Sequence, residues 1–363
     1  MTRPGGPAAR LRIGLTYDLA KEQELTGAMP EDFWAELDDE STVRGLAHAL
    51  GSLGHQVVHI GGLPGLVATL QRGRLDVDLV FNVAEGTRGR AREAQVPALL
   101  EAYGVAYTGA DPVTMALTLD KALTKLVWRG AGLPTAAFSV MASPSDLQRL
   151  PAPFPLFVKP VREGSSMGVD GGSVVNDAAA LEARVERVWA GYRQPALVEA
   201  YLPGREFTVG IVGAGESAWV LGVVETFARG HVSGYAEKRG TGIASEVREF
   251  RPLDAAQDGL DDGLEEELGD LALRAYHAVG CRDVGRVDLR CDPEGRPNLV
   301  EINALPGLVE GRSALPILAY HAGHSYQELV ALILERAVER LGNERAPGEA
   351  GRPDDRPTRR STP

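Results

Sequence analysis

The sequence predicts a mixed fold, with an N-terminal α/β domain built on a parallel sheet and an α+β region after it. Three observations support this prediction. Short apolar runs alternate with amphipathic helical patterns between residues 11 and 110, which is typical of a parallel sheet flanked by helices. Strand patterns dominate from residue 196. The length of 363 residues also suits two or three domains.

The first domain is expected over residues 11–112. Its strands are predicted at 11–17, 57–62 and 78–83, and its helices at 42–54, 63–73 and 95–104. A long acidic stretch, residues 18–40, separates the first strand from the first helix. Loops of this length are often functional or disordered.

Two further lobes are expected, over residues 113–198 and 199–341. In the first, a helix from 113 that carries DKALTK precedes strands at 135–141, 154–160 and 172–175 and a helix at 177–191. The second combines strands at 196–202, 205–213, 219–226 and 245–250 with an acidic helix at 259–278, a strand pair and two short helices. We expect residues 1–10 and 342–363 to be disordered, because the tail has many prolines and almost no apolar residues.

Composition excludes several classes of protein. The net charge of −12 disfavours a broad grip on nucleic acid. No apolar run of about 18 residues suggests a membrane span, and no signal peptide precedes the first strand. We therefore expect a cytoplasmic protein without membrane or nucleic-acid partners. Cys281 and Cys291 are expected to be buried free thiols, since a strand between them would hold them apart.

The clearest chemical signal is the sequence GRVDLRCDPEGRPNLVEINALPG, which indicates two strands joined by a turn at residues 292–295. Period-2 alternation puts Asp288 opposite Glu301 and Arg286 opposite Asn303 on one face. The apolar residues are expected on the other face, namely Val287, Leu289, Val300 and Ile302.

Facing carboxylates repel unless a cation lies between them. A hard ion such as Mg²⁺ suits a site with one Asp, one Glu and one Asn, because it completes its shell with water and substrate phosphates. This predicts phosphoryl transfer. The alternatives are a solvated polar face on an antiparallel sheet and simple ion pairing with the arginine.

A second signal is VKPVREGSSMG, where a strand ends in Lys159 and a glycine-rich loop begins. Small residues let backbone amides approach phosphate oxygens closely. Residues 164–168 also match the G-x-S-x-G elbow of serine hydrolases, but no helix is predicted directly after the serine, so this class is disfavoured. No Walker A motif occurs, and lysines at 121, 159 and 238 are left to hold phosphate.

These motifs, taken together, resemble the D-alanine:D-alanine ligases of the ATP-grasp superfamily over about residues 11–341. The stretches that carry the resemblance are TLDKALTKLVWRGAGLPT, VKPVREGSSMGV, LVEAYLPGREFTVGI, GCRDVGRVDLRCDPEGRPNLVEINALPGL and AGHSYQELVALILERA. The resemblance implies an ATP-grasp fold with an N-terminal Rossmann-like (pre-ATP-grasp) domain. It also implies an ADP-forming enzyme that joins a carboxylate to an amine through an acyl phosphate.

The resemblance also implies roles for individual residues. ATP would be held by Lys121, Lys159, Lys238, Glu199, Tyr201, Leu202, Glu206 and the loop Glu163, Gly164, Ser165, Ser166 and Gly168. Two Mg²⁺ ions, with Mn²⁺ as the alternative metal, would be bound by Asp288, Glu301 and Asn303. Catalytic roles fall to Arg286 and the Gly307 amide as an oxyanion clamp, to the γ-phosphate lysine Lys238, and to Ser165. Ser165 and Ser313 match substrate-contacting serines.

Four departures from the family surround the substrate pockets. The first βα turn is TYDLAKEQELTG, without the family's ammonium-binding glutamate, and Glu36 or Asp38 could replace it. The loop AEGTRGRAREAQ, which includes Glu85, Arg88, Arg90, Arg92 and Glu93, stands where the family has H-G-x-x-G-E-D-G. Arg239 stands where a tyrosine is expected, and one extra residue separates Gly307 from Ser313.

We therefore expect ligase chemistry on small amino acids or similar substrates other than D-alanine. The added arginines suggest a substrate with an extra carboxylate or phosphate, and a solvated basic loop is the alternative. The other functions considered are an ATP-grasp small-molecule kinase, an intramolecular amide-forming cyclase and a nucleotide-binding regulator without turnover. A homodimer is expected because it is common in the related ligases.

Overall fold

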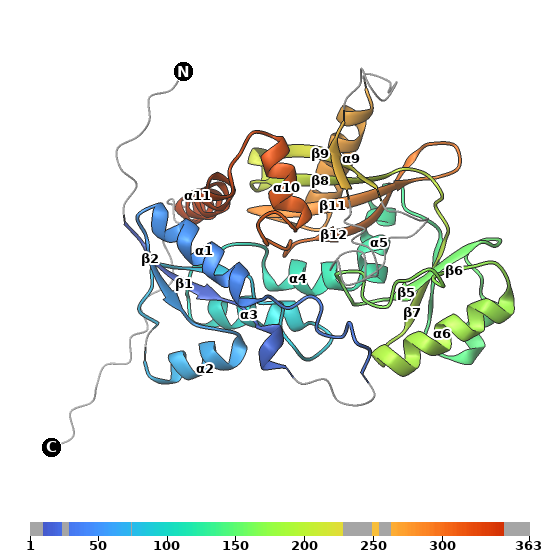
Figure 1. Ribbon diagram of the computed structural model, residues 1–363, viewed down its shortest axis with the longest axis horizontal. Helices are drawn as coiled ribbons and strands as arrows, with labels where there is room; N and C mark the ends of the chain where they lie inside the picture. The colour runs from blue at the N-terminus through green and yellow to red at the C-terminus, as the bar shows by residue number, and fades with distance from the viewer. Residues whose placement is uncertain (1–9, 24–28, 74, 228–248, 254–262, 345–363) are drawn as a thin grey trace.

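The computed structural model describes residues 10–23, 29–73, 75–227, 249–253 and 263–344 (Figure 1). Three separate sheets form the frame of the molecule. The segments expected to be disordered, 1–10 and 342–363, lie almost wholly outside the described residues. The last described helix, however, continues past residue 341 and ends at Glu344.

The N-terminal domain has the predicted parallel sheet, with strand order β2-β1-β3. Its strands are β1 (Arg12–Thr16), β2 (Gln56–His59) and β3 (Leu79–Asn82), and its helices are α1 (Glu40–Ser52), α2 (Leu63–Gln71) and α3 (Gln95–Ala102). Helix α1 begins where the Asp39 side chain accepts hydrogen bonds from the amides of Ser41 and Thr42, which is a strong N-cap.

The central lobe is a four-stranded antiparallel sheet covered by one long helix. Its strand order is β4-β7-β5-β6, with bounds Phe138–Met141 for β4, Ala196–Ala200 for β7, Leu156–Pro160 for β5 and Val174–Val175 for β6. Helix α6 (Ala178–Tyr192) packs on this sheet.

The single helix predicted from residue 113 is wrong. It is divided into α4 (Pro112–Leu119) and α5 (Lys121–Gly130). The break lies at Asp120, whose backbone is extended and whose carboxylate accepts a 3.2 Å hydrogen bond from the Leu123 amide. Asp120 therefore starts a new helix, and it fixes the direction in which Lys121 leaves the backbone.

The C-terminal lobe contains a five-stranded antiparallel sheet with the order β10-β9-β8-β11-β12. The strands are β8 (Glu206–Val212), β9 (Trp219–Phe227), β10 (Glu249–Pro252), β11 (Val284–Cys291) and β12 (Pro297–Asn303). The helices are α9 (Leu264–Ala278), α10 (Ala314–His321) and α11 (Tyr326–Glu344). Helix α11 has 19 residues, so the prediction of two short C-terminal helices holds only for α10.

Short 3-10 turns occur in all three parts of the chain, at η1 (Ala20–Glu22), η2 (Arg92–Ala94), η3 (Pro144–Gln148) and η4 (Gly215–Ser217).

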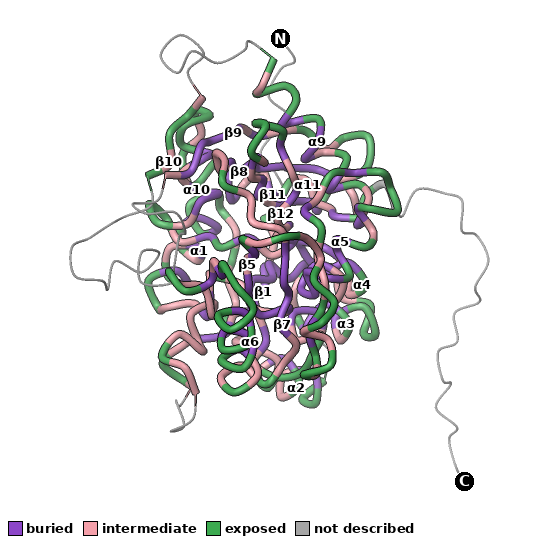
Figure 2. The backbone as a smooth tube through the Cα atoms, turned by 90° about the vertical axis from the view of Figure 1, so that its right-hand side faces the viewer, coloured by how far each residue is buried: buried purple, intermediate pink, exposed green. Residues whose placement is uncertain are grey.

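Two apolar cores flank the five-stranded sheet. One face packs on α9 and on the α4–α5 pair through residues such as Phe207, Val287 and Tyr276. A second core joins β1, β3 and α1 to α10 and α11, so the N-terminal sheet and the C-terminal helices share buried side chains. The strands of the sheets are largely buried in Figure 2.

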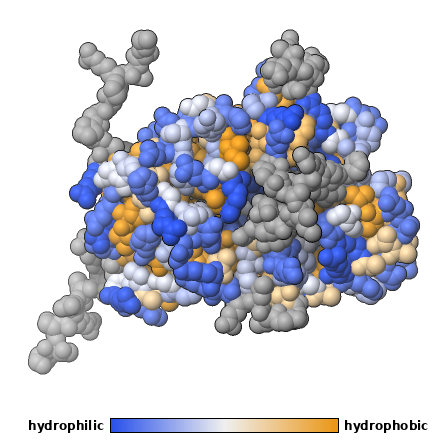
Figure 3. Space-filling view, viewed as in Figure 1, coloured by the Kyte–Doolittle hydropathy of each residue, from blue (hydrophilic) through white to orange (hydrophobic). Residues whose placement is uncertain are grey.

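The face drawn in Figure 3 is mostly hydrophilic, with apolar residues in separate patches. In the part of the chain that the structure covers, no helix has the length and apolar character needed to span a membrane. Cys281 and Cys291 are buried and free, as predicted.

Candidate active site

A cavity of about 110 Å³ lies between the four-stranded sheet and the β11–β12 hairpin. Its apolar lining includes Ala136, Phe157, Met167, Leu202 and Val300. Its polar lining consists of Lys121, Lys125, Lys159, Glu163, Ser166, Glu199, Tyr201, Glu206, Asp288, Arg290 and Glu301. The structure therefore brings eight of the twelve residues predicted to hold the nucleotide to this cavity, whereas Gly164 and Ser165 line the larger cavity described below. An apolar slot with a few convergent charges is typical of a small-molecule site.

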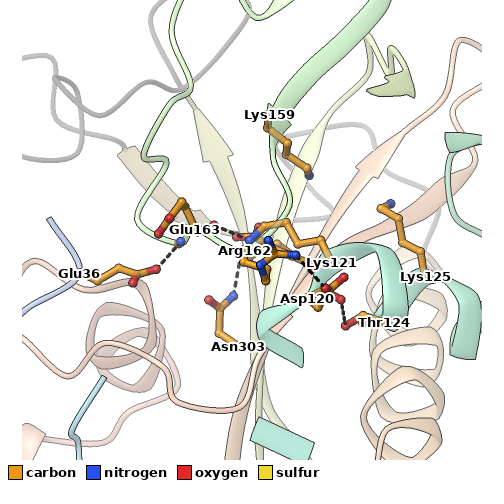
Figure 4. A network of polar contacts seen from close by, with 12 residues as sticks. Glu36, Asp120, Lys121, Thr124, Lys125, Lys159, Arg162, Glu163 and Asn303 are labelled. Carbon is orange, nitrogen blue, oxygen red and sulfur yellow. Dashed lines mark hydrogen bonds and ion pairs between the residues drawn. The ribbon is translucent and has the colours of Figure 1, made fainter. Parts of the chain in front are cut away.

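Glu199 is the centre of a buried ion network in this cavity. Its carboxylate lies 2.6 Å from the Lys125 ammonium and 2.8 Å from the Lys159 ammonium. The two lysines come from different elements, Lys125 from α5 and Lys159 from β5 (Figure 4). Burial alone would raise the pKa of Glu199, but the two lysines lower it to about 2. The glutamate is therefore ionised and rigidly held.

Lys121 connects the glycine-rich loop with the hairpin. Its ammonium donates to the Glu163 carbonyl and lies 3.7 Å from the Glu301 carboxylate. It is 8% exposed, so its charge is not dispersed into solvent. A buried ammonium at this position is suited to a phosphate oxygen.

The β11–β12 hairpin has the predicted register at the end that carries the polar residues. Asp288 pairs with Glu301, and Arg286 pairs with Asn303. A bulge then shifts the pairing between Asp288 and Leu289, so that Leu289 faces Leu299. The prediction that Val300 lies on the apolar core face is therefore wrong. Leu299 is fully buried in the core in its place, and Val300 lines the cavity of about 110 Å³.

The donor set on this hairpin fits a hard divalent ion. Asp288 accepts a 2.9 Å hydrogen bond from the Thr208 hydroxyl and pairs with Arg286 at 2.8 Å. The Asn303 amide nitrogen is 3.5 Å from Asp288. Two carboxylates and one amide oxygen around one point are ligands that Mg²⁺ prefers. No group of three or more His, Cys, Asp or Glu suited to a metal occurs in the described ranges, because the third donor here is an asparagine.

The loop from Glu163 to Gly168 presents backbone amides. Ser165 and Ser166 both have positive φ, 44° and 57°, which is costly for residues other than glycine and is found at functional sites. Successive amides in such a conformation form an anion-binding concavity. The chain then runs to β6 without a helix after Ser166, which confirms that the serine is not on a hydrolase elbow.

Residues of the acidic stretch before α1 contact this loop. Glu36 accepts a hydrogen bond from the Gly164 amide, and Asp32 accepts one of 2.8 Å from the Gly168 amide. Arg92 donates to Glu36 at 2.5 Å and to the Arg162 carbonyl at 2.9 Å. The long loop of residues 18–40 thus contributes directly to the site, as its length suggested.

A second, larger cavity of about 460 Å³ lies between the N-terminal domain and the C-terminal lobe. Its lining includes six of the predicted substrate and catalytic residues, namely Glu36, Glu85, Ser165, Arg286, Gly307 and Ser313. Lys121 and Glu301 line both this cavity and the smaller one. The two cavities therefore meet at the carboxylate hairpin.

Gly307 and Ser313 are neighbours in the wall of the larger cavity. A Cβ added at Gly307 would lie 3.0 Å from the Ser313 hydroxyl oxygen. That hydroxyl accepts a 3.0 Å hydrogen bond from the Val309 amide, and Ser313 is also the first residue before α10. The extra residue between 307 and 313 does not separate them in space.

The arginines of the loop after β3 do not line the larger cavity. Arg92 pairs with Glu36 and Glu163, and Arg90 pairs with Asp120 at 3.0 Å. Arg88 is exposed. The contacts of Arg90 and Arg92 are thus with carboxylates of the protein, and they do not support the expectation that these side chains bind an anionic substrate group. The predicted residues Lys238 and Arg239 lie outside the described residues.

Sequence reasoning missed two charged residues of the smaller cavity, Lys125 and Arg290. Lys125 lies one helical turn after Lys121 on α5, and this i, i+4 spacing is the signal that could have revealed it. Arg290 lies two residues after Asp288 on the same face of β11. It pairs with Glu206 at 3.5 Å and covers the Tyr201 ring at 5.6 Å.

The fold and the site together define an enzyme of the ATP-grasp class, in which two antiparallel sheets enclose a lysine-lined cavity. The fold matches that of a D-alanine–D-alanine ligase from Bacillus anthracis complexed with ATP, with a TM-score of 0.68 and 22% identity. The match covers 92% of this chain and 99% of that structure.

Sequence comparisons agree with this class. A family model described as the D-ala D-ala ligase C-terminus matches residues 127–335. A D-alanine–D-alanine ligase from Bordetella petrii is 35% identical over 72% of this chain and 76% of its own length. An uncharacterized protein, y4sG, from Sinorhizobium fredii is 37% identical over 81% of this chain and 87% of its own length. The chain belongs to the D-alanine–D-alanine ligase family and is a ligase of that type.

Proposed function

We propose that the protein joins a carboxylate to an amine at the expense of ATP, through an acyl-phosphate intermediate. The observation that carries the proposal is that the smaller cavity and the larger cavity meet at Lys121 and Glu301. A phosphoryl group at the end of ATP would therefore face a carboxylate bound in the larger cavity. The ATP named with the Bacillus anthracis structure supports the same assignment.

The nucleotide would occupy the smaller cavity. Glu199 and the backbone at Tyr201 and Leu202 would receive adenine, and Glu206 the ribose hydroxyls. Lys121, Lys159 and the amides of the Glu163–Gly168 loop would hold the phosphates, with Lys238 as the proposed γ-phosphate contact. Positive charge around the moving phosphoryl group is the main requirement of this chemistry.

Asp288, Glu301 and Asn303 would hold Mg²⁺. When bound, the metal would offset negative charge on the phosphate oxygens. Arg286 lies 3.8 Å from Glu301 and lines the larger cavity, where it would stabilise the oxyanion that forms at the acyl carbon, together with the Gly307 amide.

The reaction would proceed in two displacements. A carboxylate oxygen of the first substrate attacks the γ-phosphorus, and the bond to ADP breaks. The amine of the second substrate then attacks the acyl carbon, and inorganic phosphate leaves as the amine loses a proton. The loop from Glu163 to Gly168 and the segment around Glu36 would keep water away from the acyl phosphate.

We propose that the substrates are amino acids or similar molecules other than D-alanine. The loops after β1 and β3, which differ from the family pattern, both line the larger cavity through Glu36 and Glu85. A homodimer in the cytoplasm remains our prediction for the assembled state, and sedimentation of the purified chain would check the dimer.

The test is an ADP-release screen with pairs of amino acids and small acids, followed by mass spectrometry of the product. We expect ADP release that requires both substrates and a product whose mass is the sum of the two substrates less water. ADP release with a single hydroxyl-bearing substrate and a phosphorylated product would contradict the proposal and favour a kinase.

A further inference from the structure

Four carboxyl side chains form one wall of the larger cavity, which we call the acidic wall: Glu36, Asp38, Glu85 and Glu93. Two of them come from the segment before α1, and the other two follow β3. Segments distant in sequence therefore place four acids around the same space. The α-ammonium group of an amino-acid substrate alone would require about one carboxylate as its partner.

The charge of this wall is only partly offset. Glu36 pairs with Arg92, and the charge of Arg312 opposes the rise that burial causes in the pKa of Asp38. Within the described part of the chain, neither Glu85 nor Glu93 has a hydrogen bond or ion pair to its side chain.

Glu93 is the most informative member. It is only 9% exposed, it lines the cavity, and burial of an unpaired carboxylate is costly. Burial, helped by Glu36 and Glu163 and opposed by Arg92 and Lys121, raises the pKa of Glu93 to about 8. Burial and the neighbouring Glu93 also raise the pKa of Glu85. A cation placed in the cavity would remove this penalty.

The same cavity also has positively charged lining residues. Arg286 and Arg312 line it together with Gly307, and Arg312 lies 3.7 Å from the Asp39 carboxylate. An amino acid whose carboxylate pairs with Arg286 would leave its cationic groups to the acidic wall.

We propose that a substrate bound in the larger cavity carries a second cationic group besides its α-ammonium, as in an amino acid with an amine or guanidine side chain. The inference rests on the proposed ligase function and specifies its substrate class. Glu36 or Asp38 would receive the α-ammonium, and Glu85 and Glu93 the side-chain cation, because carboxylates form their strongest hydrogen bonds with charged donors.

The experiment compares substrates matched in length. Lysine and ornithine, in both D and L forms, are tested against norleucine, norvaline and glutamate with the full-length protein, each paired with a panel of amino acids. We expect kcat/KM for the basic amino acids to exceed that of the apolar isosteres by tenfold or more, about the effect of one charged hydrogen bond. Equal or better use of norleucine or glutamate would overturn the inference.

Variants separate recognition from folding. Glu85→Gln and Glu93→Gln should lower the preference for basic over apolar substrates about tenfold, whereas Glu186→Gln on the exposed surface of α6 should leave it unchanged. If Glu85 and Glu93 only share a proton for structural reasons, the preference will be unaltered in both variants, and the inference fails. If either variant does not fold, the substrate series with the unmodified protein still decides.

Calorimetry distinguishes this inference from the proposed function. Lysine is titrated into the protein with a non-hydrolysable ATP analogue at pH 7, in buffers of different ionisation enthalpy. Proton release that disappears in Glu93→Gln supports the inference even if no pair of substrates gives ADP, in which case only the ligase proposal fails. ADP release with apolar pairs alone, and no binding of lysine or ornithine, supports the ligase and refutes the cationic substrate.

Discussion

Replacement of Glu199 by glutamine removes the carboxylate that joins two buried lysines. Glu199 is 5% exposed, and its oxygens lie 2.6 and 2.8 Å from Lys125 and Lys159. Glutamine has the same shape but no charge, so two ammonium groups would face each other in the interior. The predicted loss of stability is therefore electrostatic and does not come from a cavity.

The expected magnitude follows from the burial of these groups. Loss of one partner from a buried ion pair costs about 3–5 kcal/mol, because the remaining charge is uncompensated. At roughly 2–4 °C per kcal/mol for a domain of this size class, the melting temperature should fall by about 6–20 °C. Addition of Lys125→Met should restore part of this loss, since it removes one of the two repelling charges.

Thermal unfolding of the single and double variants measures this effect. The unmodified network should also weaken in acid: the pKa of Glu199 is lowered to about 2 from an ordinary value of 4.5, so its contribution is full above pH 4.5 and is lost as the pH falls toward 2. A double variant Lys125→Met/Glu199→Gln that is less stable than Glu199→Gln, by the full cost of Lys125→Met alone, would refute the reasoning.

Three further predictions concern the hairpin, the loop and the acidic wall. Glu301→Gln should abolish ADP release and leave the circular dichroism spectrum unchanged; retained turnover would exclude the metal role. Gly168→Ala should lower kcat/KM for ATP, because φ is +69° and the new Cβ would lie 2.7 Å from Pro160. Gly171→Ala, with open space around it, is the matched control, and equal effects would refute the loop assignment. Because the folded-state pKa of Glu93 is raised from 4.5 to about 8, its contribution to stability should decrease as pH rises through this window. The pH dependence of the melting temperature between 5 and 9 should therefore be flatter in Glu93→Gln, and parallel curves would contradict the pKa shift.

The hairpin register could be predicted because it depends on local rules. Period-2 alternation and a turn rich in Asp, Pro and Gly fix which residues face each other, and Asp288 does pair with Glu301. The bulge after Asp288 could not be predicted, since Leu299 and Val300 are both apolar. Only the packing of the finished core decides which of them enters it.

The larger cavity was harder to predict than the smaller one. Its walls come from loops whose positions depend on long-range contacts, such as the hydrogen bonds from the Gly164 amide to Glu36 and from the Gly168 amide to Asp32. The arginines after β3 suggested an anionic substrate, but the ion pairs of Arg92 with Glu36 and Glu163 are visible only in three dimensions. Sequence spacing carries no information about which charges neutralise each other across domains.

The core that joins the N-terminal sheet to α11 affects the order in which the protein can mature. Ile13 and Leu15 of β1 belong to the same buried cluster as Leu329, Ile333 and Ala337 of α11. A ribosome makes the first three strands long before it makes that helix. During synthesis, the apolar surface of the N-terminal domain that packs against α11 therefore stays exposed until that helix has been made.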